Sequence, residues 1–179
     1  MDISATRIEG SGTGIVGEIL AEFRNQKGIA DRALAQLGDS DLFHAFDSES
    51  NTLAEILKHV GGNLISRWTD FLTTDGEKEW RDRDGEFEAR EDSAEELRAV
   101  WERGWGVAID EIGALTDADL DREVFIRGQS HTVHRALTRS LAHSAHHIGQ
   151  IVWLAKHLKG AEWRTLSMPK RRVEASSSG

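Results

Sequence analysis

Apolar residues recur every three or four positions along four long segments of the chain, which is the spacing of one face of an amphipathic helix. The segments span about residues 14–37, 53–74, 94–115 and 133–159, and each has roughly 20 residues or more. The pattern predicts an all-α fold. Four amphipathic helices of this length in one chain favour a four-helix bundle.

Capping residues mark several ends of these helices. Ser50 or Asn51 is a suitable N-cap for the second helix. Ser93 and Glu96 have the spacing of a capping box at the start of the third helix. Gly160 follows the last apolar position of the fourth helix, so we expect that helix to end there.

Two connections between the helices are long. The segment 75–92 is dense in charges of both signs, which is typical of a solvated surface, and Trp80 and Phe87 are expected to anchor it to the bundle. The segment 123–133 has β-branched residues on both sides of Gly128, which predicts a short hairpin or an irregular loop before the last helix.

The size and composition of the chain are those of one globular domain. It has 179 residues, of which 39% are hydrophobic and 30% are charged, with a single proline. A chain of this length buries a large core without disulfides or structural metals. We expect a single domain over residues 1–168 and a disordered tail over residues 169–179, which ends in Ser-Ser-Ser-Gly.

The charge and the missing cysteines narrow the function classes. A formal net charge of −9 repels phosphate backbones, so nucleic-acid binding by the body of the protein is not expected. The absence of cysteine excludes disulfides, thiolate ligands and a thiol nucleophile from the chain. There is no signal-peptide pattern and no apolar run long enough for a membrane span, so we expect a cytoplasmic protein without membrane partners.

Candidate chemistry gathers in residues 141–150, which hold three of the eight histidines. His143 and His147 are four residues apart and share one helix face, so they are spaced to hold a metal ion. His146 lies three residues from His143, and spacing alone does not decide which pair chelates. Catalytic metal sites usually have three protein ligands, so a third ligand is needed.

His59 is the candidate third ligand. It lies near the middle of the second helix, at a depth similar to that of the histidine pair in the fourth helix. Three imidazoles suit Zn, Ni, Cu or Fe(II) and leave coordination positions open. The alternative is that these histidines are hydrogen-bonded groups of the core. Gly61 and Gly62 follow His59 and either make room for another group or allow close helix packing.

Three further polar residues are candidates near such a site. Glu55, one turn before His59, is a candidate general base or a partner of a ligand, and the alternative is a solvated surface acid. Asn63 and Gln150 are candidate substrate-binding groups or ordinary structural hydrogen-bonding residues. The other four histidines are expected on the surface or in loops: His44, His131, His134 and His157. Of these, His131 and His134 could flank the mouth of the site.

Two strings of residues carry a family resemblance. H-S-A-H-H-I-G-Q-I in the fourth helix and I-L-K-H-V-G-G-N-L in the second, with the following I-S-R-W-T-D-F-L-T-T-D-G-E-K-E-W-R, resemble the DinB-like superfamily. The similarity extends from the first helix to Lys159. It implies a four-helix bundle, typically dimeric, in which three histidines bind a divalent metal, often zinc or nickel. By resemblance, the ligands are His59, His143 and His147, and His146 is not a ligand.

The resemblance implies several activities. Branches of the superfamily are metal-dependent hydrolases, transferases that use a small-molecule thiol, or a thiol-dependent isomerase. We therefore expect a divalent metal, a small-molecule substrate and a homodimer, with either a water or an external thiol activated at the metal. The alternative is a non-enzymatic stress-response or interaction bundle with a structural metal site.

Overall fold

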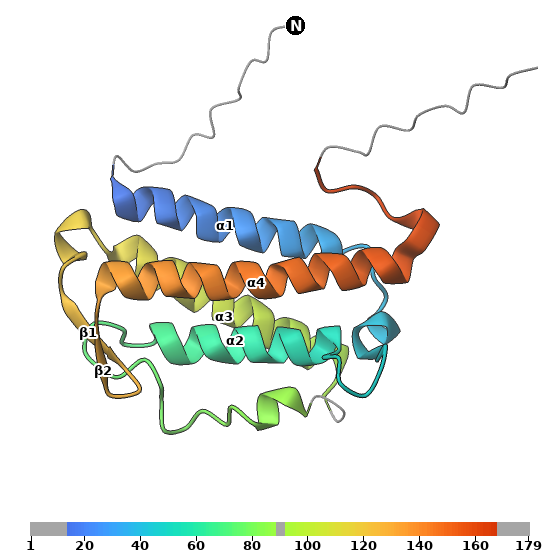
Figure 1. The fold of residues 1–179 in the computed structure, drawn as a ribbon, viewed down its shortest axis with the longest axis horizontal. Coiled ribbons are helices and arrows are strands. Elements are labelled where there is room, and N and C mark those ends of the chain that lie inside the picture. Colours follow the sequence, from blue (N-terminus) through green and yellow to red (C-terminus); the bar gives the residue numbers. More distant parts are fainter. Residues whose placement is uncertain (1–13, 89–91, 168–179) are drawn as a thin grey trace, which may run out of the picture.

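The computed structural model describes residues 14–88 and 92–167, which form a bundle of four α-helices (Figure 1). The helices are α1 (Ile15–Leu34), α2 (Leu53–Trp68), α3 (Ala94–Ala114) and α4 (Val133–Lys159). The predicted all-α four-helix bundle is confirmed, whereas the predicted disordered tail lies outside the described residues. Within the described part of the chain, every helix is too short or too polar to cross a bilayer.

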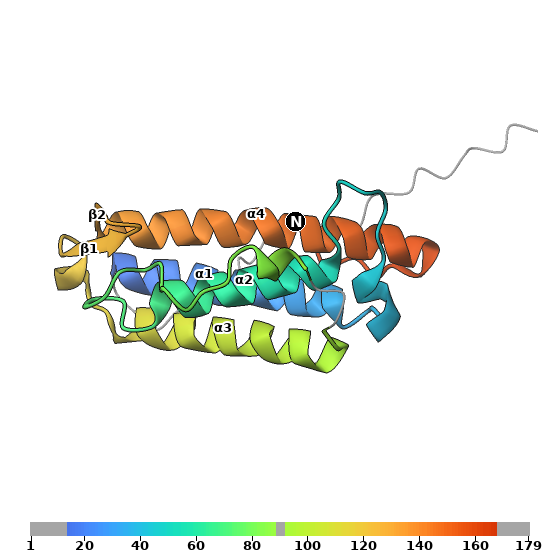
Figure 2. The ribbon, with the colours of Figure 1, turned by 90° about the horizontal axis from the view of Figure 1, so that it is seen from below.

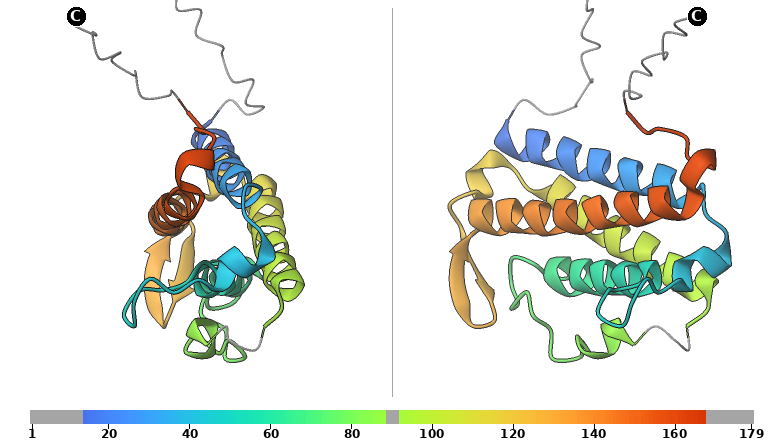
Figure 3. Two further views of the ribbon diagram at one scale, coloured as in Figure 1. Left: turned by 90° about the vertical axis from the view of Figure 1, so that its right-hand side faces the viewer. Right: turned by 45° about the vertical axis from the view of Figure 1, so that its right-hand side comes forward.

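The four helices do not simply alternate in direction along the chain. Helices α1 and α4 run one way, and α2 and α3 run the other way (Figures 1 and 3). Because α2 and α3 are parallel, the chain between them has to return along the length of the bundle. Figure 2 shows this connector passing along the outside of α2, with the short 3₁₀ helix η2 (Gly85–Phe87) in its second half.

Aromatic side chains fill the centre of the bundle. Phe23 of α1 is fully buried and contacts Trp68 of α2 and Trp105 of α3 in edge-on arrangements, with ring centroids 6.1 and 6.2 Å apart. Such arrangements place the positive edge of one ring on the negative face of another. The apolar stripes of three helices therefore meet in one core, as their periodicity predicts.

Helices α2 and α3 approach each other through two glycines. A Cβ atom on Gly104 would lie 2.6 Å from the carbonyl oxygen of Gly61, and one on Gly61 would lie 2.7 Å from the carbonyl oxygen of Val100. Both contacts are too short for any side chain. Close helix packing thus explains Gly61.

Helix α2 ends six residues before the predicted end near residue 74. Thr69 is extended, with ψ of 123°, and Asp70 after it is left-handed, with φ of 50°, so the helix ends at Trp68. Phe71 remains buried in the turn that follows, with 2% of its surface exposed. The apolar pattern therefore continued past the true end of the helix, because a buried turn also contributes to the core. Helix α1 likewise ends at Leu34, whereas Leu37 beyond it stays buried.

The segment before α4 is a hairpin and not an irregular loop. Strands β1 (Glu123–Ile126) and β2 (Gln129–Thr132) pair in antiparallel register, with Ile126 opposite Gln129. Arg127 and Gly128 form the two-residue turn, with φ of 55° and 70°. Positive φ at both turn positions matches the right-handed twist of the strands.

The connector after α2 is held by polar contacts and by only one of the two predicted aromatic anchors. Asp75 accepts hydrogen bonds from the backbone N–H groups of Arg127 at 2.8 Å and Gly128 at 2.7 Å, which joins the connector to the hairpin turn. Trp80 does not anchor it, since 61% of its surface is exposed. Phe87 does, because its ring packs against His59 with centroids 4.7 Å apart.

The glycine contact gives a stability prediction. We expect Gly104→Ala to lower the free energy of unfolding by about 1–2 kcal/mol, because overpacking against a backbone costs up to about 3 kcal/mol and alanine returns only about 1 kcal/mol of helix propensity. Gly106 lies in the same helix with nothing within 4 Å of a Cβ, so Gly106→Ala is the matched control and should raise stability. Urea unfolding measures both. Equal effects of the two substitutions would contradict the packing argument.

Candidate metal centre

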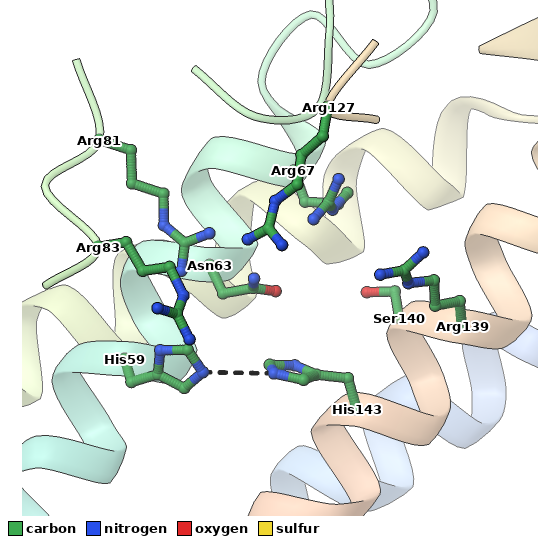
Figure 4. A pocket seen from close by; sticks show the side chains of 9 residues that line it. All are labelled: His59, Asn63, Arg67, Arg81, Arg83, Arg127, Arg139, Ser140 and His143. Atoms are coloured by element: carbon green, nitrogen blue, oxygen red, sulfur yellow. Dashed lines mark hydrogen bonds between the residues drawn. The ribbon is translucent and has the colours of Figure 1, made fainter. Parts of the chain in front are cut away.

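Three histidines converge between α2 and α4. His59 comes from α2, and His143 and His147 come from α4; one ring nitrogen of each lies within 4.8 Å of the others. The Nε2 atoms of His59 and His143 are 3.3 Å apart (Figure 4). Tetrahedral coordination with metal–nitrogen bonds of about 2.0–2.1 Å places the ligand nitrogens about 3.3–3.4 Å apart. The spacing of His59 and His143 therefore fits two ligands of one metal ion, with His147 close by.

Hydrogen bonds at the opposite ring nitrogens orient two of the imidazoles. His59 Nδ1 lies 2.9 Å from Glu86 Oε2, and because an ionised carboxylate only accepts, Nδ1 donates the proton. His147 Nδ1 lies 2.8 Å from the amide oxygen of Gln150, which also accepts. Both rings thus keep the lone pair on Nε2 free to bind a metal.

The two histidines of α4 are held in the neutral form. Burial, with smaller effects of the neighbouring His147 and His59, lowers the pKa of His143 to about 3. Burial also lowers the pKa of His147, against the opposing effect of its hydrogen bond to Gln150. Neutral imidazole is the form that binds metals, so little proton competition is expected at neutral pH.

Glu86 is a buried carboxylate that reaches His59 from the connector. It is 5% exposed and accepts two hydrogen bonds of 2.7 Å from Arg81, one at each oxygen. Burial raises the pKa of Glu86, but the hydrogen bonds from His59 and Arg81 outweigh it and hold the pKa below its ordinary value. The carboxylate therefore stays ionised beside the three histidines.

A polar cavity of about 190 Å³ opens next to the histidines. His59 and His143 form one end of its wall, and Asn63 and Ser140 lie beside them (Figure 4). The rest of the lining consists of five arginines: Arg67, Arg81, Arg83, Arg127 and Arg139. The candidate metal centre is thus accessible to a small ligand from a strongly cationic side.

Comparison with known protein families identifies the family of this chain. Residues 11–172 match the model of a family described as a protein of unknown function (DUF1572). The chain belongs to the DUF1572 family. No curated protein matches it. Since the family description names no activity, the function of this DUF1572 protein has to be argued from the site itself.

Glu55 has a structural position in the DUF1572 protein. Its carboxylate accepts hydrogen bonds from the backbone N–H of Thr52 at 2.7 Å and from the Thr52 hydroxyl at 3.0 Å. Thr52 is the N-cap of α2, in place of the predicted Ser50 or Asn51, because its hydroxyl accepts the N–H of Glu55 in return. Glu55 does not line the cavity, so its predicted role as a general base gains no support.

The two other polar candidates lie at the site. Asn63 is one turn after His59 and lines the cavity, whereas Gln150 bonds to His147. Their predicted roles in substrate binding stay predictions. His146 is exposed and does not belong to the group of three histidines. His131, expected on the surface, is instead buried at 9% exposure, because it lies on the inner face of β2.

The sequence interpretation missed Glu86 and Arg81. Both lie in the charged connector, where they resemble the surrounding surface residues. A signal for Glu86 was Gly62, since a Cβ at this position would overlap a carboxylate oxygen of Glu86. Each glycine of the pair therefore follows one of the two interpretations, with Gly61 allowing helix packing and Gly62 making room for a group.

Removing the charge of Glu86 should weaken metal binding. We expect Glu86→Gln to lower the affinity for zinc by about 10–100-fold, the range found for partners of metal-binding histidines, because the His59 ring loses its orienting carboxylate. Glu88→Gln, an exposed acid two residues further along the connector, is the matched control. Competition with a chromophoric chelator measures both affinities. An equal affinity of the two variants would remove Glu86 from the site.

Proposed function

We propose that this protein is a divalent-metal-dependent enzyme of the DinB-like superfamily that hydrolyses a small polar substrate. His59, His143 and His147 are the proposed ligands, and zinc or nickel is the proposed metal. The observation that carries the proposal is the convergence of three imidazoles, two of them oriented by hydrogen bonds and two of them lining a polar cavity. When bound, such a metal lowers the pKa of a coordinated water toward neutrality.

The cavity favours an enzyme over a purely structural metal site. Structural zinc sites are closed by four protein ligands, whereas catalytic sites have three and an open position. In the described residues, the group of potential ligands contains three histidines and no fourth member. His59 and His143 also line the cavity, so a ligand in the cavity would lie directly beside them.

The chain's own residues would hold this site rigidly. The Glu86–Arg81 pair orients His59, and Gln150 orients His147. Ser140 accepts a hydrogen bond of 3.3 Å from the indole nitrogen of Trp68, which links the cavity wall to the aromatic core. Asn63 has both a donor and an acceptor on its side chain, and we propose that it orients the substrate in the cavity.

The size of the cavity favours water as the activated group. Its volume of about 190 Å³ is below the range of roughly 300–1,000 Å³ for sites that hold drug-sized ligands. One observation supports thiol S-transfer as the second candidate. A wider groove of about 530 Å³ is lined by Ile56, Gln150 and Trp153, among others, and has room for a small-molecule thiol.

Histidine substitutions test the proposal. We expect the wild type to hold one divalent metal per chain and His143→Ala to lose it, because two imidazoles remain. His146→Ala is the matched control, since His146 is exposed on the same helix, and it should keep the metal. Metal analysis of untagged protein gives the stoichiometry. Absence of metal from the wild type after incubation with zinc and nickel would overturn the metal site.

Activity then separates the candidates. Metal-loaded protein is assayed with a panel of small esters and amides, and with small thiols plus an electrophile. Hydrolysis that a chelator abolishes and metal restores supports the proposal, whereas turnover only with a thiol supports the second candidate. A lower melting temperature after chelation without any turnover would support the structural alternative.

We also propose a homodimer, as the resemblance implies. Trp153 on α4 is 62% exposed, stacks on His157 with ring centroids 5.8 Å apart and lies near Phe46, which forms an exposed aromatic surface. Light scattering should show a dimer for the wild type and a monomer for Trp153→Glu. Trp80→Glu is the control, because Trp80 is equally exposed, at 61%, on the connector. A monomeric wild type would contradict the proposal.

A further inference from the structure

The arginines around the cavity come from four different parts of the fold. Arg67 belongs to α2, Arg81 and Arg83 to the connector, Arg127 to the hairpin turn and Arg139 to α4. Bringing five like charges together is unfavourable, and it occurs here in a chain with a net charge of −9. The gathering therefore needs an explanation beyond the overall composition.

The carboxylates of the described residues do not balance these charges. Glu86 and Glu77 both pair with Arg81, at 2.7 and 3.3 Å. Glu77 also pairs with Arg127 at 3.2 Å and lies 3.8 Å from Arg67. Arg83 pairs with Asp84 at 3.5 Å, so three carboxylates pair with these five arginines, and Glu77 alone is shared among three of them. Positive charge therefore remains in excess.

Among the five arginines, Arg67 is the one for which the excess of positive charge is energetically most costly. Only 9% of its side chain is accessible, and its Nη1 atom has no hydrogen-bond partner among the described residues. Burial, with smaller effects of the like charges of Arg139, Arg81 and Arg127, lowers its pKa to about 10 against the opposing effect of Glu77. The guanidinium remains charged at neutral pH, and a buried, incompletely paired charge is costly unless a ligand completes its contacts.

Arg139 faces Arg67 from the other helix. It forms none of the ion pairs found between the described residues. Figure 4 shows the two guanidinium groups directed toward the same space, with Ser140 beside it. Two planar forks of N–H donors in one cavity match the paired oxygens of a carboxylate or a phosphate.

The helices place this cationic space next to the candidate metal centre. His59, Asn63 and Arg67 follow each other at four-residue steps on α2, and so lie on one face. His143 and Arg139 are likewise four residues apart on α4. Helices α2 and α4 run in opposite directions (Figure 1). Both rows therefore lead from the histidines toward the arginines.

We propose that Arg67 and Arg139 bind a negatively charged oxyanion group of the substrate, a carboxylate or a phosphate, beside the three histidines. The assignment of this ligand as a substrate rests on the proposed function, whereas the oxyanion site itself does not. The anionic group would complete the hydrogen bonds of Arg67 and offset the excess positive charge. The substrate class is therefore a small anionic ester or amide.

Binding of two simple probes tests the site. Calorimetry with methyl phosphate and with acetate, at constant ionic strength because salt screens such contacts, should show binding to the wild type. The stronger probe identifies the oxyanion. Arg67→Met and Arg139→Met should each weaken it by about tenfold or more, the loss expected for charge-assisted hydrogen bonds. Arg103→Met is the matched control, because Arg103 is exposed on α3 outside the cavity.

His143→Ala separates this inference from the proposed function. Suppose that His143→Ala has lost the metal and still binds the probe, and that adding Arg67→Met to this variant abolishes the binding. The arginines then bind oxyanions independently of any metal. Arg139 is exposed, so Arg139→Met keeps the test valid if Arg67→Met fails to fold. Absence of probe binding to the wild type, or equal binding by Arg139→Met and Arg103→Met, would overturn the inference even if the metal site is real.

If turnover is found, kinetics give a second test. Arg139→Met should raise KM at least tenfold for an ester that carries a carboxylate or phosphate and leave KM unchanged for the matching neutral ester. A merely structural role would affect both substrates alike. An equal change in KM for the two esters would therefore contradict the proposed recognition of the charge.

Discussion

The hydrogen bond between His59 and Glu86 joins the bundle to the connector, and most of the site depends on it. Glu86 reaches the middle of α2 because the chain returns along the outside of that helix to begin the parallel α3. Gly62 leaves the space for its carboxylate, and Arg81 keeps it ionised. A shorter connector or a side chain at position 62 would leave His59 without its orienting partner. The long connection is thus part of the site.

Electrostatics around this hydrogen bond divide the site into two zones. Near the histidines, the neutral imidazoles of His143 and His147 lie close to the single carboxylate of Glu86, which would partly neutralise a divalent cation. Toward the hairpin, guanidinium groups outnumber carboxylates, and Asp75 holds the turn that carries Arg127. At about 4 Å, two unit charges interact by about 4 kcal/mol at an effective dielectric constant near 20. The hairpin therefore holds together a cluster of like charges that costs free energy of folding. Such a cluster fits a role in ligand binding better than a role in stability.

The sequence was sufficient to predict those features that a local periodicity of residues determines. The apolar spacing located all four helices, with α4 matching its predicted range, and the histidine spacing with the family resemblance selected the three residues that converge. It was insufficient where contacts join distant segments. Glu86 lies 27 residues from His59, and nothing local distinguishes it from neighbouring acids. The arginines of the cavity were missed for the same reason. The end of α2 was misplaced because Phe71 is buried without being helical.

The geometry of the two antiparallel helices also limits the size of the substrate. Four residues of helix rise by about 6 Å, so Arg139 begins about 6 Å along α4 from His143. Arg67 begins about twice that distance along α2 from His59, and its long side chain spans part of the difference. A group held between the two guanidinium ends would therefore lie only a few bonds from anything bound at the histidines. The cavity volume of about 190 Å³ agrees with this limit. A compact anion fits both constraints, whereas a long or neutral chain leaves the buried Nη1 of Arg67 without a hydrogen-bond partner among the described residues.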